Sequence, residues 1–190
     1  MIEFDPATYK DDPHGLKQYI REVPDFPKPG ILFKDISPLL GVMFKVADGF
    51  HREIMEKNPN VHGRYDYKLM AFDARGFIFG GALALRLGVP MGMIRKAGKL
   101  PGPILSCEYG LEYRDKDTLE IQADAIKPGD EVILIDDVLA TGGTAEAGVK
   151  LVEMAGGKVV GCLFVIELTY LKGREKLSGQ NVISLVRYDK

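Results

Sequence analysis

Two adjacent carboxylates and a glycine-rich turn mark the second half of the sequence as a place where chemistry could occur. Asp136 and Asp137 follow a continuous apolar run, and the turn after them consists of Ala140-Thr141-Gly142-Gly143-Thr144. Glycines let backbone N–H groups converge on an anion, threonine hydroxyls add donors, and the start of a helix favours negative charge by about 0.3–1 kcal/mol. The turn therefore suits a phosphate monoester, and the carboxylates suit sugar hydroxyls or a hydrated Mg²⁺.

This turn differs from two common phosphate-binding patterns, because neither GxxxxGK[ST] nor GxGxxG occurs there. A plain strand-to-helix turn with a capping threonine is the alternative interpretation. Such a turn does not need two acids, two hydroxyls and two glycines. We therefore expect an anion site at this position.

The surrounding pattern predicts a sheet edge that holds these residues. The run 131–135 is almost wholly aliphatic, as expected of a strand buried on both faces of a parallel sheet, and 136–144 is predicted to be a loop. Further strands are predicted over 68–72, 90–94, 118–122, 159–168 and 182–186, and helices over 15–22, 38–57, 77–87 and 145–155. This alternation predicts a doubly wound, mainly parallel α/β sheet with flanking helices, which binds ligands at the carboxyl ends of its strands.

The segment 98–114 contains Gly98, Pro101, Gly102, Pro103 and Gly110, which predicts an irregular loop. A loop of this length within a compact domain is more often a lid than a spacer. We therefore expect a lid over about 98–114.

Length and composition predict one ordinary globular domain, since 46% of the 190 residues are apolar and 27% are charged. The net charge of −2 argues against nonspecific binding of nucleic acid. No apolar run is long enough to span a bilayer, no secretory signal is recognisable, and the two cysteines lack disulfide or metal spacing. We expect a cytoplasmic protein that acts on neither nucleic acid nor membrane.

The segment 132–144 resembles the motif that binds phosphoribosyl pyrophosphate in the type I phosphoribosyltransferases. Further segments resemble the members of this family that act on adenine, namely 25–38, 75–77, 95–103, 111–113, 167–169 and 172–177. The resemblance covers nearly the whole chain from about Val23. It implies one type I phosphoribosyltransferase domain over 1–190, with a five-stranded parallel core, a small N-terminal hood over about 10–38 and a flexible lid loop over about 98–114.

The same resemblance implies a reaction of purine salvage. Adenine N9 displaces pyrophosphate from C1 of phosphoribosyl pyrophosphate and gives AMP. Mg²⁺ is implied as the cofactor, held mainly through substrate and water near Asp136 and Asp137, and the family usually forms homodimers.

The pyrophosphate that leaves needs fixed cations around it. Arginine suits this task because its guanidinium donates two parallel hydrogen bonds. In the family, the turn that matches 73–76 is the pyrophosphate loop and often contains a cis peptide bond. The candidate pyrophosphate residues follow the ends of two predicted strands and are Asp73, Ala74, Arg75, Arg95, Lys96 and Lys99.

The candidate catalytic residues are Glu112, Tyr113 and Arg75. The transition state of the family carries positive charge at C1, so the site must exclude water. By resemblance, Glu112 manages proton transfer at the base, and Tyr113 closes over the ribose or its phosphates. The same Glu-Tyr dipeptide occurs at 108–109. Glu112 is favoured because 111–113 matches the family more closely, and Glu108 is the alternative.

The base is expected to contact Ile31, Leu32, Phe33 and Lys34. By resemblance, main-chain groups at Leu32 read the exocyclic amine of adenine. The alternative is that 31–33, a run too short to classify, belongs to the core. Two departures from the family are Lys34, at a position that is often arginine, and the charged stretch 114–117.

Two other functions are compatible with parts of the sequence. A related enzyme could use hypoxanthine, guanine, xanthine or orotate, although Glu167 stands where a 6-oxo purine site would need a donor. A transcription regulator that senses phosphoribosyl pyrophosphate is the second alternative. The short segment before Val23 and the net charge disfavour it.

Overall fold

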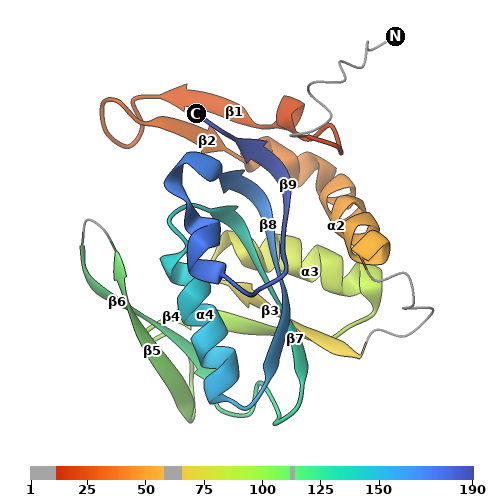
Figure 1. Cartoon of the computed structure of the whole chain (residues 1–190), viewed down its shortest axis with the longest axis vertical. Helices are drawn as coiled ribbons and strands as arrows, with labels where there is room; N and C mark the ends of the chain where they lie inside the picture. Colours follow the sequence, from red (N-terminus) through yellow and green to blue (C-terminus); the bar gives the residue numbers. More distant parts are fainter. Residues whose placement is uncertain (1–11, 58–65, 112–113) are drawn as a thin grey trace.

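The computed structural model describes residues 12–57, 66–111 and 114–190, and within them one large sheet forms the body of the molecule (Figure 1). Its strand order is β5-β6-β4-β3-β7-β8-β9. The strands are β3 (Tyr67–Phe72), β4 (Met91–Lys96), β5 (Ile104–Leu111), β6 (Arg114–Gln122), β7 (Glu131–Leu139), β8 (Lys158–Leu168) and β9 (Val182–Tyr188).

Five neighbouring strands of this sheet, β4-β3-β7-β8-β9, run parallel to one another. β7 lies in their middle, where Ile135 pairs with Ala71 of β3 on one side and with Leu163 of β8 on the other. All three side chains are buried, as the aliphatic composition of these runs predicts. The predicted parallel core is therefore confirmed, and it brings the ends of β3 and β7 to one edge.

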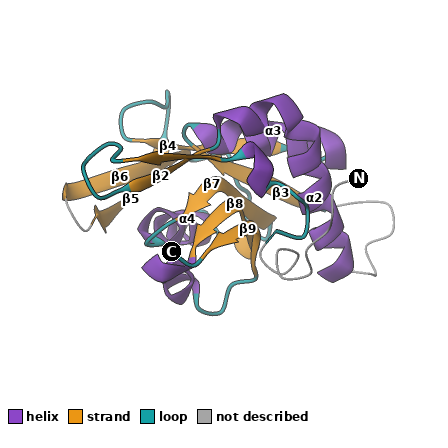
Figure 2. Ribbon diagram, turned by 90° about the horizontal axis from the view of Figure 1, so that it is seen from above, coloured by secondary structure: helices purple, strands orange, loops and turns teal. Residues whose placement is uncertain are grey.

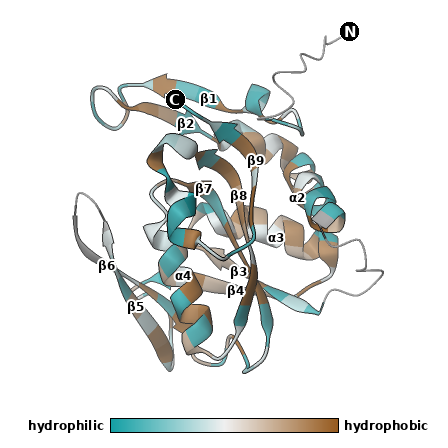
Figure 3. Ribbon diagram, in the orientation of Figure 1, coloured by the Kyte–Doolittle hydropathy of each residue, from teal (hydrophilic) through white to brown (hydrophobic). Residues whose placement is uncertain are grey.

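Helices cover both faces of this core (Figure 2). α2 (Met43–Lys57) and α3 (Arg75–Leu87) pack on one face, where Phe50 and Leu83 are buried. α4 (Gly143–Met154) packs on the other, where Leu151 meets Phe164 of β8 in one apolar cluster. Figure 3 shows apolar residues concentrated along the central strands. The doubly wound arrangement agrees with the prediction.

The prediction of an irregular loop over 98–114 is wrong for most of that segment. β5 and β6 form an antiparallel hairpin, in which Cys107 pairs with Leu119. The alternating residues Leu105, Cys107 and Tyr109 pack against the apolar cluster beneath α4. The glycines and prolines of the segment hid this two-residue alternation of apolar side chains in the sequence. The alternation specifies a strand here because α4 lies over these side chains.

The N-terminal region also differs from its prediction. In place of a helix over 15–22 there are a short 3-10 helix, η1 (Lys17–Tyr19), and the strand β1 (Arg21–Pro24). β1 pairs antiparallel with β2 (Leu32–Asp35) in a separate two-stranded sheet. Strand pairing overrides the helical spacing of the apolar residues here, and the short apolar run 31–33 enters β2.

Several element boundaries move as well. The helix predicted over 38–57 divides into a 3-10 helix, η2 (Ser37–Val42), and α2. β7 continues through 136–139, predicted to be a loop, because Val138 and Leu139 pair with β8. Two further 3-10 helices, η3 (Thr169–Leu171) and η4 (Gly173–Leu177), connect β8 to β9. None of the described helices is long and apolar enough to cross a membrane.

Candidate active site at the carboxyl end of the sheet

A cavity of about 150 Å³ lies where β7 ends and α4 begins. Gly142 has a φ of +82°, which glycine adopts without steric cost, and Gly143 is the first residue of α4. The first N–H groups of a helix have no partner within it, so this end of the cavity suits an anion. The whole predicted phosphate turn lines the cavity, with Asp136, Val138, Leu139, Ala140, Thr141, Gly142, Gly143, Thr144, Ala145 and Phe164 as its walls.

The paired carboxylates lie at the same strand end. The backbone N–H of Asp137 donates a hydrogen bond of 2.8 Å to Oδ1 of Asp136. Burial and the neighbouring charge of Asp137 raise the pKa of Asp136 well above its ordinary value. Oδ2 of Asp137 lies 2.5 Å from Nε of Arg75, which is its ionic partner. Burial and the charge of Asp137 therefore disfavour the charged form of Asp136, which an added cation would favour.

The turn after β3 packs directly on this centre. A Cβ on Gly76 would lie only 2.9 Å from the carbonyl oxygen of Ile135, so the glycine permits the close approach. The peptide bond between Asp73 and Ala74 is cis. Arg75 follows this turn as the first residue of α3, and its side chain is half exposed.

Two more of the predicted cations join the turn. Nε of Arg95 lies 3.0 Å from Oδ2 of Asp73, and Nζ of Lys99 lies 3.6 Å from the same oxygen. Lys96 contacts Asp117 of β6 at 3.0 Å instead. The structure thus brings Arg95 and Lys99 to Asp73, at the turn that carries Arg75, and directs Lys96 to the hairpin.

The predicted base segment occupies β2 and the loop before it. Ile31 and Leu32 are exposed, and Phe33 packs edge-on against Phe26 at a centroid distance of 5.0 Å. Lys34 is buried: its Nζ pairs with Glu22 across the two-stranded sheet and lies 4.1 Å from the centre of the Tyr188 ring. Lys34 therefore ties β2 to the end of β9.

Glu112 and Tyr113 lie outside the described residues. The earlier dipeptide, Glu108-Tyr109, lies in β5, and the Tyr109 ring is next to the phosphate turn. A Cβ on Gly143 would lie 3.6 Å from Cδ2 of Tyr109. Burial raises the pKa of Tyr109, whose hydroxyl lies 3.3 Å from Oδ2 of Asp117. The hairpin thus contacts the cavity wall through Tyr109, a residue to which sequence reasoning gave no role.

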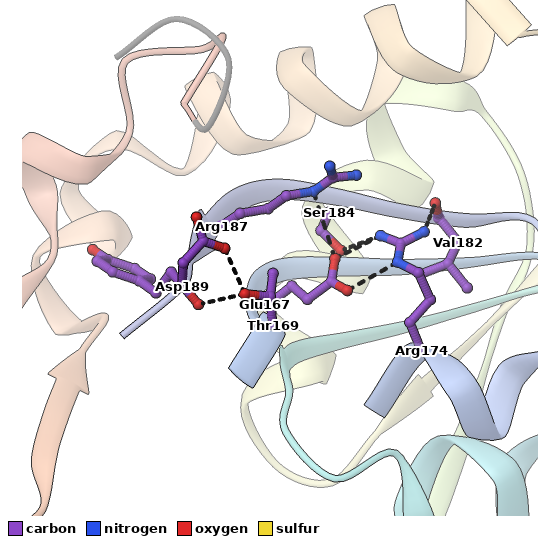
Figure 4. Close-up of polar contacts among 8 residues, drawn as sticks. Glu167, Thr169, Arg174, Val182, Ser184, Arg187 and Asp189 are labelled. Atoms are coloured by element: carbon purple, nitrogen blue, oxygen red, sulfur yellow. Dashed lines mark hydrogen bonds and ion pairs between the residues drawn. The ribbon is translucent and has the colours of Figure 1, made fainter. Parts of the chain in front are cut away.

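A second polar cluster joins β8 to η4 (Figure 4), and sequence reasoning used only its Glu167, as an argument against a 6-oxo purine. Arg174 donates two hydrogen bonds to Glu167, of 2.9 and 2.5 Å, and a third of 3.0 Å to the carbonyl oxygen of Val182. Burial raises the pKa of Glu167, but hydrogen bonds from Arg174 and Ser184 outweigh this, and the net shift is downward. Arg187 adds a more distant positive charge, 3.6 Å from Glu167. The sequence signal for this cluster was the resemblance of the segment 172–177 to the family.

The family model for the phosphoribosyl transferase domain matches residues 45–182. Curated relatives agree with it. The adenine phosphoribosyltransferase of Carboxydothermus hydrogenoformans is 50% identical over 173 residues, which are 91% of this chain and 99% of the relative. That of Caldanaerobacter subterraneus subsp. tengcongensis is also 50% identical, over 91% of this chain and 97% of its own.

Solved structures give the same result. The adenine phosphoribosyltransferase of Saccharomyces cerevisiae, in complex with an imino-altritol bisphosphate and adenine, has a TM-score of 0.84 and 41% identity over 90% of this chain and 96% of its own. The enzyme of Trypanosoma brucei, in complex with AMP, pyrophosphate and ribose 5-phosphate, has a TM-score of 0.79 and 28% identity over 90% and 77%. These likenesses confirm the predicted type I phosphoribosyltransferase fold, and the chain belongs to the adenine phosphoribosyltransferases.

Proposed function

We propose that the cavity at the start of α4 holds the 5′-phosphate of phosphoribosyl pyrophosphate while the enzyme transfers the phosphoribosyl group to adenine, giving AMP and pyrophosphate. The observation that carries the proposal is that all five residues of the turn 140–144 line this one small cavity at a helix start. Backbone N–H groups and threonine hydroxyls are the donors that a phosphate monoester requires. Relatives solved with adenine or with AMP and pyrophosphate support the choice of substrates.

The pyrophosphate site follows from the cations around the turn after β3. Arg95 and Lys99 both contact Asp73, two residues before Arg75, which pairs with Asp137, and all three cationic side chains are at least partly exposed. Their guanidinium and ammonium groups would hold the leaving group and stabilise its developing charge. Lys96, which pairs with Asp117, is the weaker member of the predicted set.

The residues at the end of β7 fit a Mg²⁺ ion that is bound together with the substrate. Asp136 and Asp137 offer the hard oxygen ligands that Mg²⁺ prefers, and a cation would lower the pKa of Asp136, which burial and the charge of Asp137 raise. Among the described residues, no three His, Cys, Asp or Glu side chains are grouped as a metal site, so substrate and water oxygens must complete the coordination. A bound Mg²⁺ would supply positive charge to the pyrophosphate group.

The base and the lid complete the proposal. Ile31, Leu32 and Phe33 would cover one face of adenine, with main-chain groups at Leu32 reading the amine. Lys34 would act indirectly, by fixing β2 through Glu22 and Tyr188. Glu112 would exchange the proton at the base, Tyr113 would close over the sugar, and the hairpin would exclude water during the reaction.

We further propose a cytoplasmic homodimer that uses the outer side of α3 and β4. Leu85 is 87% exposed there, and Ile78, Met91 and Met93 are also exposed. Met91 lies beside α3, since its Sδ lies 3.1 Å from the position of a Cβ on Gly80, and Ile78 and Leu85 lie seven residues apart on one side of that helix. Exposed apolar side chains gathered in this way are typical of subunit interfaces. A monomer in multi-angle light scattering would contradict this part.

The central experiment measures product formation with five bases. Purified enzyme is given phosphoribosyl pyrophosphate, Mg²⁺ and adenine, hypoxanthine, guanine, xanthine or orotate, and the nucleotide is identified by chromatography. AMP should form from adenine at least about a hundredfold faster than any other nucleotide, because a site that pairs with one exocyclic group discriminates strongly against its absence. Faster turnover of a 6-oxo purine would overturn the assignment of the base.

A further inference from the structure

The segment η4 lies in direct backbone contact with the phosphate turn. A Cβ added to Gly142 would collide with the carbonyl oxygen of Gly173, and one added to Gly173 would collide with the carbonyl oxygen of Ala140. Only two glycines allow the chains to approach so closely. Whatever side chains η4 carries on this side are therefore held beside the turn.

The position of η4 is fixed by the cluster drawn in Figure 4. Arg174, the residue after Gly173, is held by both oxygens of Glu167 and by the carbonyl oxygen of Val182. At the other end of η4, Leu177 is 2% exposed and belongs to the apolar cluster beneath α4. Because η4 is anchored at both ends, it cannot rotate freely relative to the turn.

This anchoring brings Lys176 to the cavity wall. A 3-10 helix has three residues per turn, so Gly173 and Lys176 lie on the same side of η4. Nζ of Lys176 lies 3.9 Å from the point that a Cβ on Gly143 would occupy. Lys176 is exposed, and no described carboxylate forms an ion pair with it. Its ammonium is therefore available to an anion at the turn.

The cavity lacks a cation of its own. Its lining contains one ionisable side chain, the carboxylic acid of Asp136, and otherwise neutral residues. A phosphate monoester carries close to two negative charges at neutral pH, whereas helix N–H groups supply only partial positive charge. A nearby ammonium group would neutralise the part of the phosphate's negative charge that the backbone N–H groups do not compensate.

We propose that Lys176 is a further binding residue for the 5′-phosphate of the substrate, presented to the turn by the Gly142–Gly173 contact and by the Glu167–Arg174 anchor. This proposal rests on the assignment of residues 140–144 to the 5′-phosphate. Lys176 adds a charge-assisted hydrogen bond from outside the turn. The alternative is an ordinary surface lysine exposed to solvent.

The experiment compares the binding of AMP with that of adenosine, since these ligands differ only in the 5′-phosphate. Calorimetric titrations use the wild type, Lys176→Met, Lys176→Arg and, as the matched control, Lys172→Met. Lys172 belongs to the same connection but lines a separate hollow with Glu167 and Arg187. Lys176→Met should bind AMP about 10- to 100-fold more weakly, the effect of losing one charge-assisted hydrogen bond, and should bind adenosine as the wild type does.

Two further results should accompany this loss. Lys176→Arg should restore most of the affinity for AMP, and Lys172→Met should leave it unchanged. In steady-state assays, Lys176→Met should raise KM for phosphoribosyl pyrophosphate more than it lowers kcat, since a binding contact is lost.

Unchanged affinity of Lys176→Met for AMP would overturn the proposal, and so would equal weakening of AMP and adenosine, which would indicate a structural role. Either outcome, in a wild type that still forms AMP and binds ribose 5-phosphate, leaves the proposed function standing. A wild type that does not bind ribose 5-phosphate would instead remove the phosphate site itself.

Discussion

Nε of Arg75 lies 2.5 Å from Oδ2 of Asp137, and this ion pair ties the turn after β3 to the carboxyl end of β7. The carboxylate is almost fully buried, whereas the side chain of Arg75 is 53% exposed. A buried carboxylate needs a compensating charge, which Arg75 provides. In the proposed function, Mg²⁺ beside Asp137 would compensate this carboxylate in its place, and Arg75 would then be available to pyrophosphate.

Removal of Mg²⁺ should therefore abolish AMP formation without destabilising the ligand-free protein. EDTA is expected to stop turnover, and added MgCl₂ to restore it. In thermal unfolding, MgCl₂ should raise Tm substantially only when phosphoribosyl pyrophosphate is also present, because the described carboxylates do not form a complete metal site. An equal rise of Tm without substrate would show that the protein alone holds the metal.

The neighbouring glycines 142 and 143 should respond differently to the same substitution. Gly143→Ala meets only ordinary van der Waals contacts, so the protein should fold normally. The added methyl group should take space beside the phosphate and raise KM for phosphoribosyl pyrophosphate about tenfold or more, equivalent to about 1.4 kcal/mol. Unchanged KM would argue against the placement of the 5′-phosphate.

Gly142→Ala is the companion variant, which should lower the free energy of unfolding. Its φ of +82° and the collision with Gly173 should cost at least about 2 kcal/mol of unfolding free energy, within the range known for strained backbone. Urea unfolding measures this loss. Equal stability of the two variants would mean that the backbone contact between Gly142 and Gly173 is not required.

Glu112→Gln should lower kcat by about 10²–10⁴-fold while the affinity for AMP is kept, because a proton-transfer group acts mainly in the transition state. Glu108→Gln is the matched control, with the same change in the same Glu-Tyr dipeptide. It should retain most of its activity. If Glu108→Gln is the variant that loses turnover, the acid–base role belongs to Glu108.

Glu167 should make the protein more stable at neutral than at acidic pH. Its pKa in the folded state is below the ordinary value of 4.5, so its contribution is complete above that pH and is lost as pH falls through the folded-state pKa. Glu167→Gln should cost on the order of 3 kcal/mol at neutral pH, the lower end for a broken buried pair, since Arg174 is 40% exposed.

The measurement is urea unfolding of the wild type and Glu167→Gln at about pH 7 and at about pH 3.5, below the ordinary pKa of a glutamate. The difference between the two proteins should shrink at the lower pH. Arg187→Gln serves as the control. It should change the free energy of unfolding less than Glu167→Gln does, because Arg187 lies farther from Glu167, at 3.6 Å, and is half exposed. A difference that does not vary with pH would mean that the charge of Glu167 contributes nothing.

Local pattern was sufficient to predict the parallel core and the turn 140–144 at the start of a helix. The aliphatic run 131–135 has no stable place except inside a sheet, and the glycines and threonines of 140–144 carry their anion preference in the backbone itself. Asp136 and Asp137 are placed beside this turn by the last part of β7 alone. For these residues, the groups that could do chemistry are neighbours along the chain, so the sequence by itself brings them together.

Tertiary structure decided the features that depend on residues far apart in the sequence. The hairpin of β5 and β6 forms because Leu105, Cys107 and Tyr109 pack beneath α4. The sequence of 98–114 alone does not indicate that α4 lies over it. Likewise, Lys176 meets Gly143 only because two glycines, 31 residues apart in number (142 and 173), bring their backbones into contact. Sequence determined which groups could bind a phosphate, whereas packing determined which distant groups reach it, since close approach is a property of two surfaces together.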